Sequence, residues 1–449
     1  MDKKKVFVVL VSAFVIMICL TYQGTYSYFT ATVEGTGNRE NNTSTGQTDT
    51  LENLILSEGS NVVSSAMIPG DSVTYRFTVQ NPNNIDVCFN LLWSNTTNTF
   101  INQKDLVVKL EKSDGTVLVN NKQFPATNSG TTELLLGTSI KASTTETYTL
   151  TVTYLNTDED QTADMDKSFS GTIIGELGEC RIPIAVETIL LKGETDELKY
   201  DNTTDNNLRY VGANPSNYVS FNNELWRIIG VFNNIDDGTG TKEARLKIIK
   251  DEPYSEEISW SSNDINDWTQ ASLQEELNGT YLNSIENLYQ EMIGDAIWNL
   301  GGVSSYTTSD NGLASHFYTY ERGTNVYSGN SATWIGKIAL MYPSDYGYAT
   351  SGGSAINRET CLNTALYNWY TSSDCYTNDW LYSISSNKWT LTHNTQSRNR
   401  IFVISSYVFE NQYITSSISG IVFPTVYLDS NVKIVSGDGS EGNPFELSF

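Results

Sequence analysis

Histidine, cysteine and basic residues are scarce in this chain of 449 residues, and each shortage excludes a class of function. The two histidines, His316 and His393, are too few for a multi-histidine metal centre, and no H-E-x-x-H protease motif occurs. Only 27 lysines and arginines oppose 52 aspartates and glutamates, so the net charge is −25. Such an acidic surface repels phosphate backbones and anionic lipid, so we expect no nucleic-acid partner.

Motifs that mark common enzymes are also missing. No G-x-S-x-G elbow, G-x-x-x-x-G-K-[ST] phosphate loop or C-x-x-C pair occurs. His316 lies in a Ser-, Gly- and Tyr-rich stretch and His393 follows Thr392, so no catalytic motif frames either residue. We therefore predict no catalytic residue and no obligatory cofactor. The alternative is a secreted enzyme whose cleft, in the second half of the chain, uses a histidine or the late cysteines.

An apolar run near the N-terminus predicts export. Basic residues at 3–5 precede an apolar stretch from Val6 to Leu20, which is shorter than the ~20 residues that a membrane span needs. We expect residues 1–28 to be a signal peptide that is cleaved near Ser27 or Tyr28. The alternative is an uncleaved anchor, which would be the protein's contact with the membrane. Both readings place the protein outside the cell, secreted or on the surface.

The cysteines fit an oxidising compartment. Cys361 and Cys375 lie close together in one aromatic-rich stretch, which predicts a local disulfide that removes about 3 kcal/mol of unfolded-state entropy. Cys88 and Cys180 could pair with each other or remain buried thiols, and Cys19 lies in the predicted signal peptide.

Residues 29–179 read as a first domain made of strands. Apolar and polar residues alternate with period two in segments such as Val73–Val79 and Tyr148–Tyr154, separated by turn residues such as Pro69 and Gly70. Many short antiparallel strands between turns favour a β-sandwich, so the fold class is expected to be mainly β.

Carboxylates gather in one predicted hairpin loop of this domain, at Asp158, Asp160, Asp164 and Asp166. A calcium site is one interpretation, because hard cations bind several oxygens at once. The alternative is a solvated, charged turn that prevents strands of neighbouring molecules from pairing.

The composition changes after a predicted linker at residues 180–190, since eight of the nine tryptophans lie beyond residue 200. We expect residues 191–449 to form one α+β domain, with a central strand at Leu225–Phe232. Helical spacing of apolar residues predicts helices at Ser272–Asn278 and Ile285–Leu300.

Two parts of the first domain resemble the TasA/camelysin group of Gram-positive surface and biofilm-matrix proteins. The segment Gly24–Thr30 is similar to the export segment of that group, and Pro69-Gly70-Asp71 before an alternating strand is similar to its domain. The resemblance covers most of residues 24–176. It implies a jelly-roll-like sandwich, export, and self-assembly by exchange of strands between subunits.

The second domain resembles a module of secreted proteins from gut Firmicutes, related to the C-type-lectin and formylglycine-generating-enzyme folds. One departure is Phe423-Pro424, where the group has Arg-Pro, so any role of that arginine is absent here. The resemblance is carried by Trp226-Arg227, Trp268 with Ser272-Leu273 and Leu277-Asn278, Tyr342–Tyr346, Asn378-Asp379-Trp380 and Pro424–Leu428.

Aromatic rings, amides and carboxylates of the second domain suggest a sugar site, since sugars stack on rings and need directed hydrogen bonds. We expect a non-enzymatic, adhesin-like surface or matrix protein that binds an extracellular glycan or other surface ligand. Besides this binding role and the secreted enzyme considered above, a third possibility is a purely structural fibre subunit. The predicted ligand-binding residues are Trp334, Asp345, Asn378, Asp379, Trp380 and Trp389.

Overall fold

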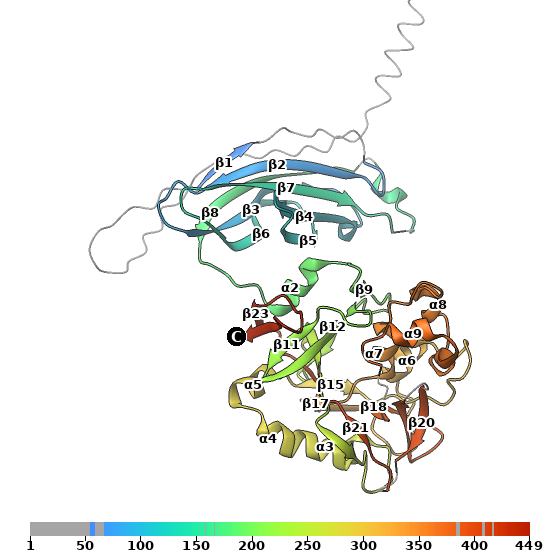
Figure 1. Ribbon diagram of the computed structural model, residues 1–449. Coiled ribbons are helices and arrows are strands. Elements are labelled where there is room, and N and C mark those ends of the chain that lie inside the picture. The colour runs from blue at the N-terminus through green and yellow to red at the C-terminus, as the bar shows by residue number, and fades with distance from the viewer. Residues whose placement is uncertain are drawn as a thin grey trace, which may run out of the picture. The chain divides into compact units, whose positions relative to one another are not determined.

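The computed structural model describes residues 54–58, 67–157, 159–165, 167–382, 387–405, 409–414 and 417–449 (Figure 1). The chain divides into two compact units, of which the first ends at Arg181 and the second begins at Ile182. The predicted signal peptide and its cleavage residues, Ser27 and Tyr28, lie outside the described residues. Among the residues that are described, no helix is both long enough and apolar enough to cross a membrane.

The first unit is built from antiparallel strands, as the alternating sequence predicts. One sheet has the strand order β1-β2-β7-β4-β5 and the other has the order β6-β3-β8. Two short helices, η1 (Gln103–Asp105) and η2 (Thr162–Asp164), lie in its loops. The strands are β1 (Ile55–Glu58), β2 (Ser72–Gln80), β3 (Val87–Asn98), β4 (Leu106–Lys112), β5 (Val117–Gln123), β6 (Asn128–Ile140), β7 (Thr145–Tyr154) and β8 (Phe169–Gly178).

Both sheets of the first unit contribute to one core. In β2 the buried side chains alternate with exposed ones, and Phe77 stacks on Tyr148 of the neighbouring strand at 5.6 Å between ring centroids. Phe89 of the other sheet meets the edge of Tyr148 at 6.2 Å. Trp93 packs over Gly171, where an added Cβ would lie 2.9 Å from the indole, so only glycine fits. Period-two patterning therefore positions this core as expected.

The described residues of the second unit form three sheets. The largest has nine strands and follows the order β17-β22-β13-β12-β11-β24-β23, with β9 and β10 beside β12. A second sheet has the order β14-β21-β18-β19-β20, and β15 with β16 forms a ribbon. The strands are β9 (Leu198–Tyr200), β10 (Leu208–Tyr210), β11 (Tyr218–Phe221), β12 (Glu224–Asp236), β13 (Lys242–Lys250), β14 (Ser255–Ile258), β15 (Ala296–Asn299), β16 (Thr333–Gly336), β17 (Ile338–Ala339), β18 (Lys388–His393), β19 (Arg400–Ile404), β20 (Phe409–Tyr413), β21 (Gly420–Val422), β22 (Thr425–Tyr427), β23 (Lys433–Ser436) and β24 (Phe445–Ser448).

Strand β12 is the predicted central strand, and its buried part runs without interruption from Trp226 to Phe232. A continuous apolar run suits a strand that is covered on both faces. Gly230 is required there, because an added Cβ would lie 2.3 Å from the carbonyl oxygen of Leu208 on β10.

Helices of the second unit are short and lie around these sheets. Helix α2 occupies part of the predicted linker. Its Ala185, Val186 and Ile189 are buried in the core of the second unit, so this segment belongs to that unit. The helices are α2 (Ala185–Lys192), η3 (Trp268–Gln270), α3 (Ser272–Glu276), η4 (Leu277–Tyr281), α4 (Leu282–Ser284), α5 (Asn287–Met292), α6 (Ala314–Glu321), α7 (Pro343–Ala349), α8 (Arg358–Leu362), η5 (Leu366–Thr371) and α9 (Ser373–Thr377).

The prediction of one helix over Ile285–Leu300 is wrong. Helix α5 ends at Met292, and after Gly294 the chain continues as strand β15, which pairs with β16. Burial in β15 alternates between Ala296 and Trp298 inside and their neighbours outside, which is strand periodicity. The helical spacing across this segment is therefore the sum of a short helix and a short strand.

Disulfides join Cys88 to Cys180 and Cys361 to Cys375, so the predicted local pair is present and the second pair also forms. Each bond lies within one unit. Two disulfides fit an extracellular or otherwise oxidising environment.

Candidate functional site

Two of the three tryptophans of the predicted ligand site, Trp380 and Trp389, are buried in the core. Trp389 is 1% exposed and its Nε1 donates to the carbonyl of Ile258 at 2.9 Å. Trp380 is 9% exposed and donates to the carbonyl of Tyr210 at 3.0 Å. A buried indole with a satisfied N–H has no free group for an external ligand, so these two residues do not form an exposed binding surface.

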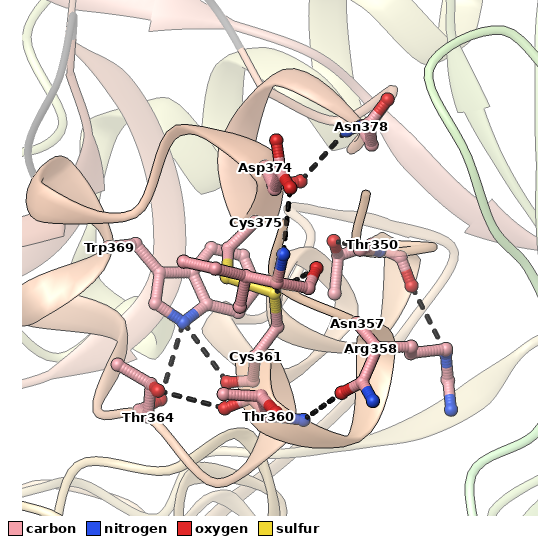
Figure 2. The surroundings of a disulfide bond; sticks show 12 residues. Thr350, Asn357, Arg358, Thr360, Cys361, Thr364, Trp369, Asp374, Cys375 and Asn378 are labelled. Carbon is pink, nitrogen blue, oxygen red and sulfur yellow. Dashed lines mark hydrogen bonds between the residues drawn. A yellow bond between two sulfur atoms is a disulfide. The ribbon is translucent and has the colours of Figure 1, made fainter. Parts of the chain in front are cut away.

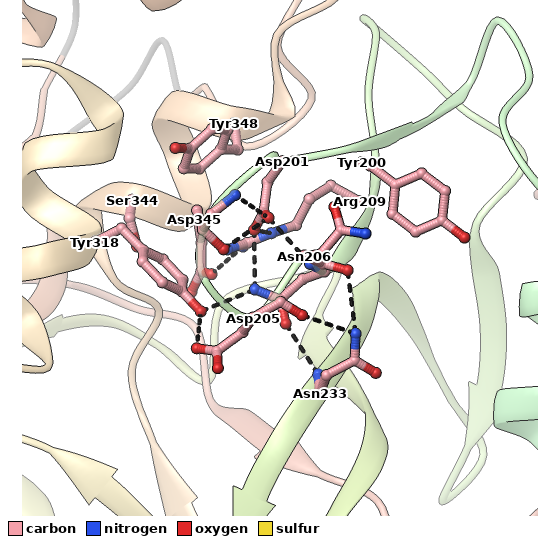
Figure 3. A network of polar contacts seen from close by, with 12 residues as sticks. Tyr200, Asp201, Asp205, Asn206, Arg209, Asn233, Tyr318, Ser344, Asp345 and Tyr348 are labelled. Carbon is pink, nitrogen blue, oxygen red and sulfur yellow. Dashed lines mark hydrogen bonds and ion pairs between the residues drawn. The ribbon is translucent and has the colours of Figure 1, made fainter. Parts of the chain in front are cut away.

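Asp345 lies in a buried ion network rather than on the surface (Figure 3). Its Oδ1 is 2.7 Å from Arg209 Nη1 and its Oδ2 is 2.5 Å from Lys247 Nζ. Arg209 Nε also lies 3.0 Å from Asp201 Oδ2. Burial would raise the pKa of Asp345, but Lys247 and Arg209 outweigh burial and hold that pKa below its usual value. The predicted ligand carboxylate therefore ties β10 and β13 to the start of α7.

Asp379 is also buried, and its Oδ1 accepts from the backbone N–H of Leu381 at 2.9 Å. Burial raises the pKa of Asp379 well above its ordinary value. Its neighbour Asn378 is half-buried and donates to the carbonyl of Asp374 at 3.0 Å. Trp334 is half-buried on β16 with its ring edge-on to Trp268. Asn378 and Trp334 thus keep partial exposure, but they belong to separate elements.

The predicted calcium residues brace a loop where they are described. Asp160 is exposed and accepts from the backbone N–H and the hydroxyl of Thr162, at 3.0 and 2.7 Å. Asp164 is buried and accepts from the backbone N–H of Ile101 at 2.5 Å. Asp158 and Asp166 lie outside the described residues. Within the described part of the chain, no group of three or more His, Cys, Asp and Glu residues could hold a metal ion.

Both histidines act as hydrogen-bond acceptors for the backbone. The N–H of Tyr327 donates to His393 Nε2 at 3.1 Å, and burial lowers the pKa of His393 to about 4. The N–H of Leu313 donates to His316 Nδ1 at 3.4 Å at the start of α6. A neutral His393 fixed by backbone groups supports the fold rather than a proton transfer.

The late cysteines form a local brace, which Figure 2 shows. Trp369 Nε1 donates to the carbonyls of Cys361 and Thr364, at 3.3 Å each. Asp374 Oδ2 accepts from the N–H groups of Ala355 and Ile356, at 2.8 Å each. The disulfide and these hydrogen bonds fix the segment that carries η5 and α9.

Helix η5 presents two tyrosines outward. Its Leu366 and Trp369 are buried, whereas Tyr367 is half-buried and Tyr370 is 50% exposed. A 3-10 helix has three residues per turn, so residues three apart share a face. Burial of one face on the core therefore leaves the tyrosine face free.

Strand β20 supplies the facing side chains. Among the described strands it lies at the edge of its sheet, beside β19, and Phe409, Asn411 and Tyr413 share one of its faces. Burial decreases along this face, from the buried Phe409 to Tyr413, which is 45% exposed. Arg400 lies opposite Tyr413 in the antiparallel register.

A chain of contacts links these side chains through Tyr306. The ring of Tyr306 lies 5.8 Å from that of Tyr367, which lies 6.1 Å from that of Tyr370. Asn411 Nδ2 donates to the hydroxyl of Tyr306 at 3.1 Å. We name this set the tyrosine surface; its members are Tyr306, Tyr367, Tyr370, Arg400, Asn411 and Tyr413.

The tyrosine surface combines the groups that sugars need. Its outer rings, Tyr370 and Tyr413, are about half exposed, so they offer apolar faces to C–H groups. Arg400 has further N–H groups beyond the one that donates to Asn411 Oδ1, and these can donate directed hydrogen bonds. Sequence reasoning missed this set because its members come from three distant stretches. The spacing Leu366-x-x-Trp369 beside Tyr367-x-x-Tyr370 was the one local signal for it.

No protein-family model matches the chain, and no curated protein sequence matches it.

Proposed function

We propose that the protein is exported and displayed on the surface or in the matrix of a Gram-positive bacterium. The support is the N-terminal apolar run with its basic start, the resemblance of residues 24–176 to the TasA/camelysin group, and two disulfides. In this proposal the first unit is a jelly-roll-like sandwich, and the second is a C-type-lectin-like domain that carries the ligand site.

The second unit, in this proposal, binds an extracellular glycan at the tyrosine surface and carries out no reaction. The observation that carries the proposal is the contact chain from Tyr370 to Tyr413, whose two ends are about half exposed. Its links, in order, are Tyr367, Tyr306, Asn411 and Arg400. Aromatic rings beside an amide and a guanidinium suit a sugar better than an apolar ligand, because sugar hydroxyls require directed partners.

A glycan array tests this function. The secreted chain is applied with and without calcium, together with Tyr370→Ala and Tyr413→Ala. We expect binding by the native chain and a loss of about fivefold in each variant, since a ring that stacks on its ligand contributes on the order of 1 kcal/mol. Ile335→Ala on β16, which removes a side chain that is 55% exposed, is the control and should bind normally. Absence of binding to any glycan would refute the proposal.

A further inference from the structure

Arg400 is the cationic member of the tyrosine surface. Its guanidinium carbon lies 4.0 Å from the ring centre of Tyr413, and its Nη1 donates to Asn411 Oδ1 at 2.7 Å. These two contacts hold the guanidinium plane in a fixed orientation while the side chain remains partly exposed. Arg400 is therefore oriented before any ligand arrives.

Arg400 also has no acidic partner in the part of the chain that the structure describes. Within the described residues no carboxylate oxygen lies within 4.0 Å of its guanidinium, whereas Arg209 has two aspartates at 3.0 and 2.7 Å. The chain has 52 acidic residues for 27 basic ones, so a carboxylate from outside the protein finds few cations to pair with. A guanidinium has five N–H donors in a planar fork, and the contact with Asn411 uses one of them.

We propose that the tyrosine surface selects an acidic sugar, whose carboxylate pairs with Arg400 while its ring packs on the exposed tyrosines. This inference rests on the proposed glycan-binding function and names its ligand class. A carboxylate matches the guanidinium fork in two parallel hydrogen bonds, which a hydroxyl cannot do. The net charge of −25 disfavours anions over most of the protein, so the preference for acid depends on this one cation.

Calorimetric titration of the full secreted chain with two matched probes tests the inference. The probes are trigalacturonic acid and its methyl ester, which has the same rings and hydroxyls without the charge. We expect the acid to bind about tenfold or more tightly than the ester, as a charge-assisted pair predicts. In Arg400→Gln we expect the order to reverse, because the remaining charge of the protein repels the acid.

Arg398→Gln is the matched control. Arg398 is exposed and lies two residues before Arg400, so this variant loses the same charge close to the site. The variant should keep the preference for the acid. The thermal unfolding midpoint of each variant reports whether its fold is intact. Equal binding of acid and ester by the native chain overturns this inference but leaves the glycan-binding function standing. If native chain and Tyr370→Ala both fail to bind either probe, and no glycan on the array binds, both proposals are refuted.

Discussion

At the scale of single residues, burial decides what the charged groups do. Glu321 is fully buried, and Ser344 donates to its carboxylate through the backbone N–H at 3.0 Å and through the hydroxyl at 2.5 Å. Burial raises the pKa of Glu321 to about 7, although Arg322 and Ser344 act in the opposite direction. An acid whose folded pKa is raised stabilises the fold most at pH values below its unfolded pKa, and that contribution is lost as the pH rises through 7.

We therefore expect Glu321→Gln to increase the free energy of unfolding above neutral pH. A glutamine stays neutral and keeps a hydrogen bond to Ser344, so at pH 8 the variant should be more stable by about 3 kcal/mol, and near pH 4 it should equal the native chain. Urea unfolding of the second unit between pH 4 and pH 8 measures this difference. Glu275→Gln, at an exposed position, is the control and should show no such trend. A constant difference across the range would contradict the assignment.

Asp345 gives a second prediction at this scale. Asp345→Asn removes the carboxylate that pairs with both Lys247 and Arg209, and Arg209 alone keeps its contact with Asp201. Breaking a buried ion pair from one side costs about 3–5 kcal/mol. Urea unfolding at pH 7 should show this loss. Asp295→Asn changes an exposed aspartate and should alter stability by less than about 0.5 kcal/mol. An Asp345→Asn variant as stable as the native chain would show that the network contributes little.

At the scale of elements, the sequence predicts what depends on neighbours along the chain. Period-two alternation identified β2 and β7, and a continuous apolar run identified β12. The segment around Gly294 misled the same reasoning, because a short helix followed by a short strand imitates helical spacing. Patterns report periodicity within one element and lose accuracy where elements of a few residues meet.

The candidate site shows the other limit of sequence reasoning. Large rings suit sugars, which is why the sequence favours tryptophans as ligand contacts, but two of those predicted, Trp380 and Trp389, are only 9% and 1% exposed. Exposure cannot be read from residue type, since it depends on which face of an element meets the core. Tyr306, Tyr367 and Asn411 come together only through the tertiary fold, so no spacing along the chain could indicate their contact.

The Cys361–Cys375 disulfide links element structure to the site. It closes a loop with a sequence separation of 14, and this loop contains η5 with Tyr367 and Tyr370. Replacing both cysteines by alanine should lower the free energy of unfolding by about 3 kcal/mol through loop entropy. The same variant should bind glycans more weakly, because η5 loses its brace.

The Cys88–Cys180 pair is the matched comparison for that variant. Its removal by alanine should cost about 4–5 kcal/mol, since its sequence separation is 92, yet glycan binding should be unchanged because the pair lies in the first unit. Unfolding in urea and glycan titration of both double variants measure the two effects. Equal effects on glycan binding would show that the local brace does not position η5.

At the scale of the whole molecule, the two units have separate cores. The buried hydrophobic cluster of the first unit includes Phe77 and Phe89, and that of the second includes Trp226 and Trp298; no residue that the structure describes belongs to both. Cooperative unfolding depends on a shared core, so each unit should unfold as a unit of its own.

Scanning calorimetry should therefore resolve two transitions, and core variants should assign them. Phe77→Leu shrinks a fully buried ring of the first core and should cost about 1–3 kcal/mol, which lowers one midpoint by several degrees. Trp298→Phe should lower the other midpoint by a similar amount, because the ring of Trp298 packs against that of Tyr427 in the second core, with 4.8 Å between the ring centroids. If both variants shifted the same transition, the two cores would be energetically coupled and the glycan-binding unit would depend on the first unit for its stability.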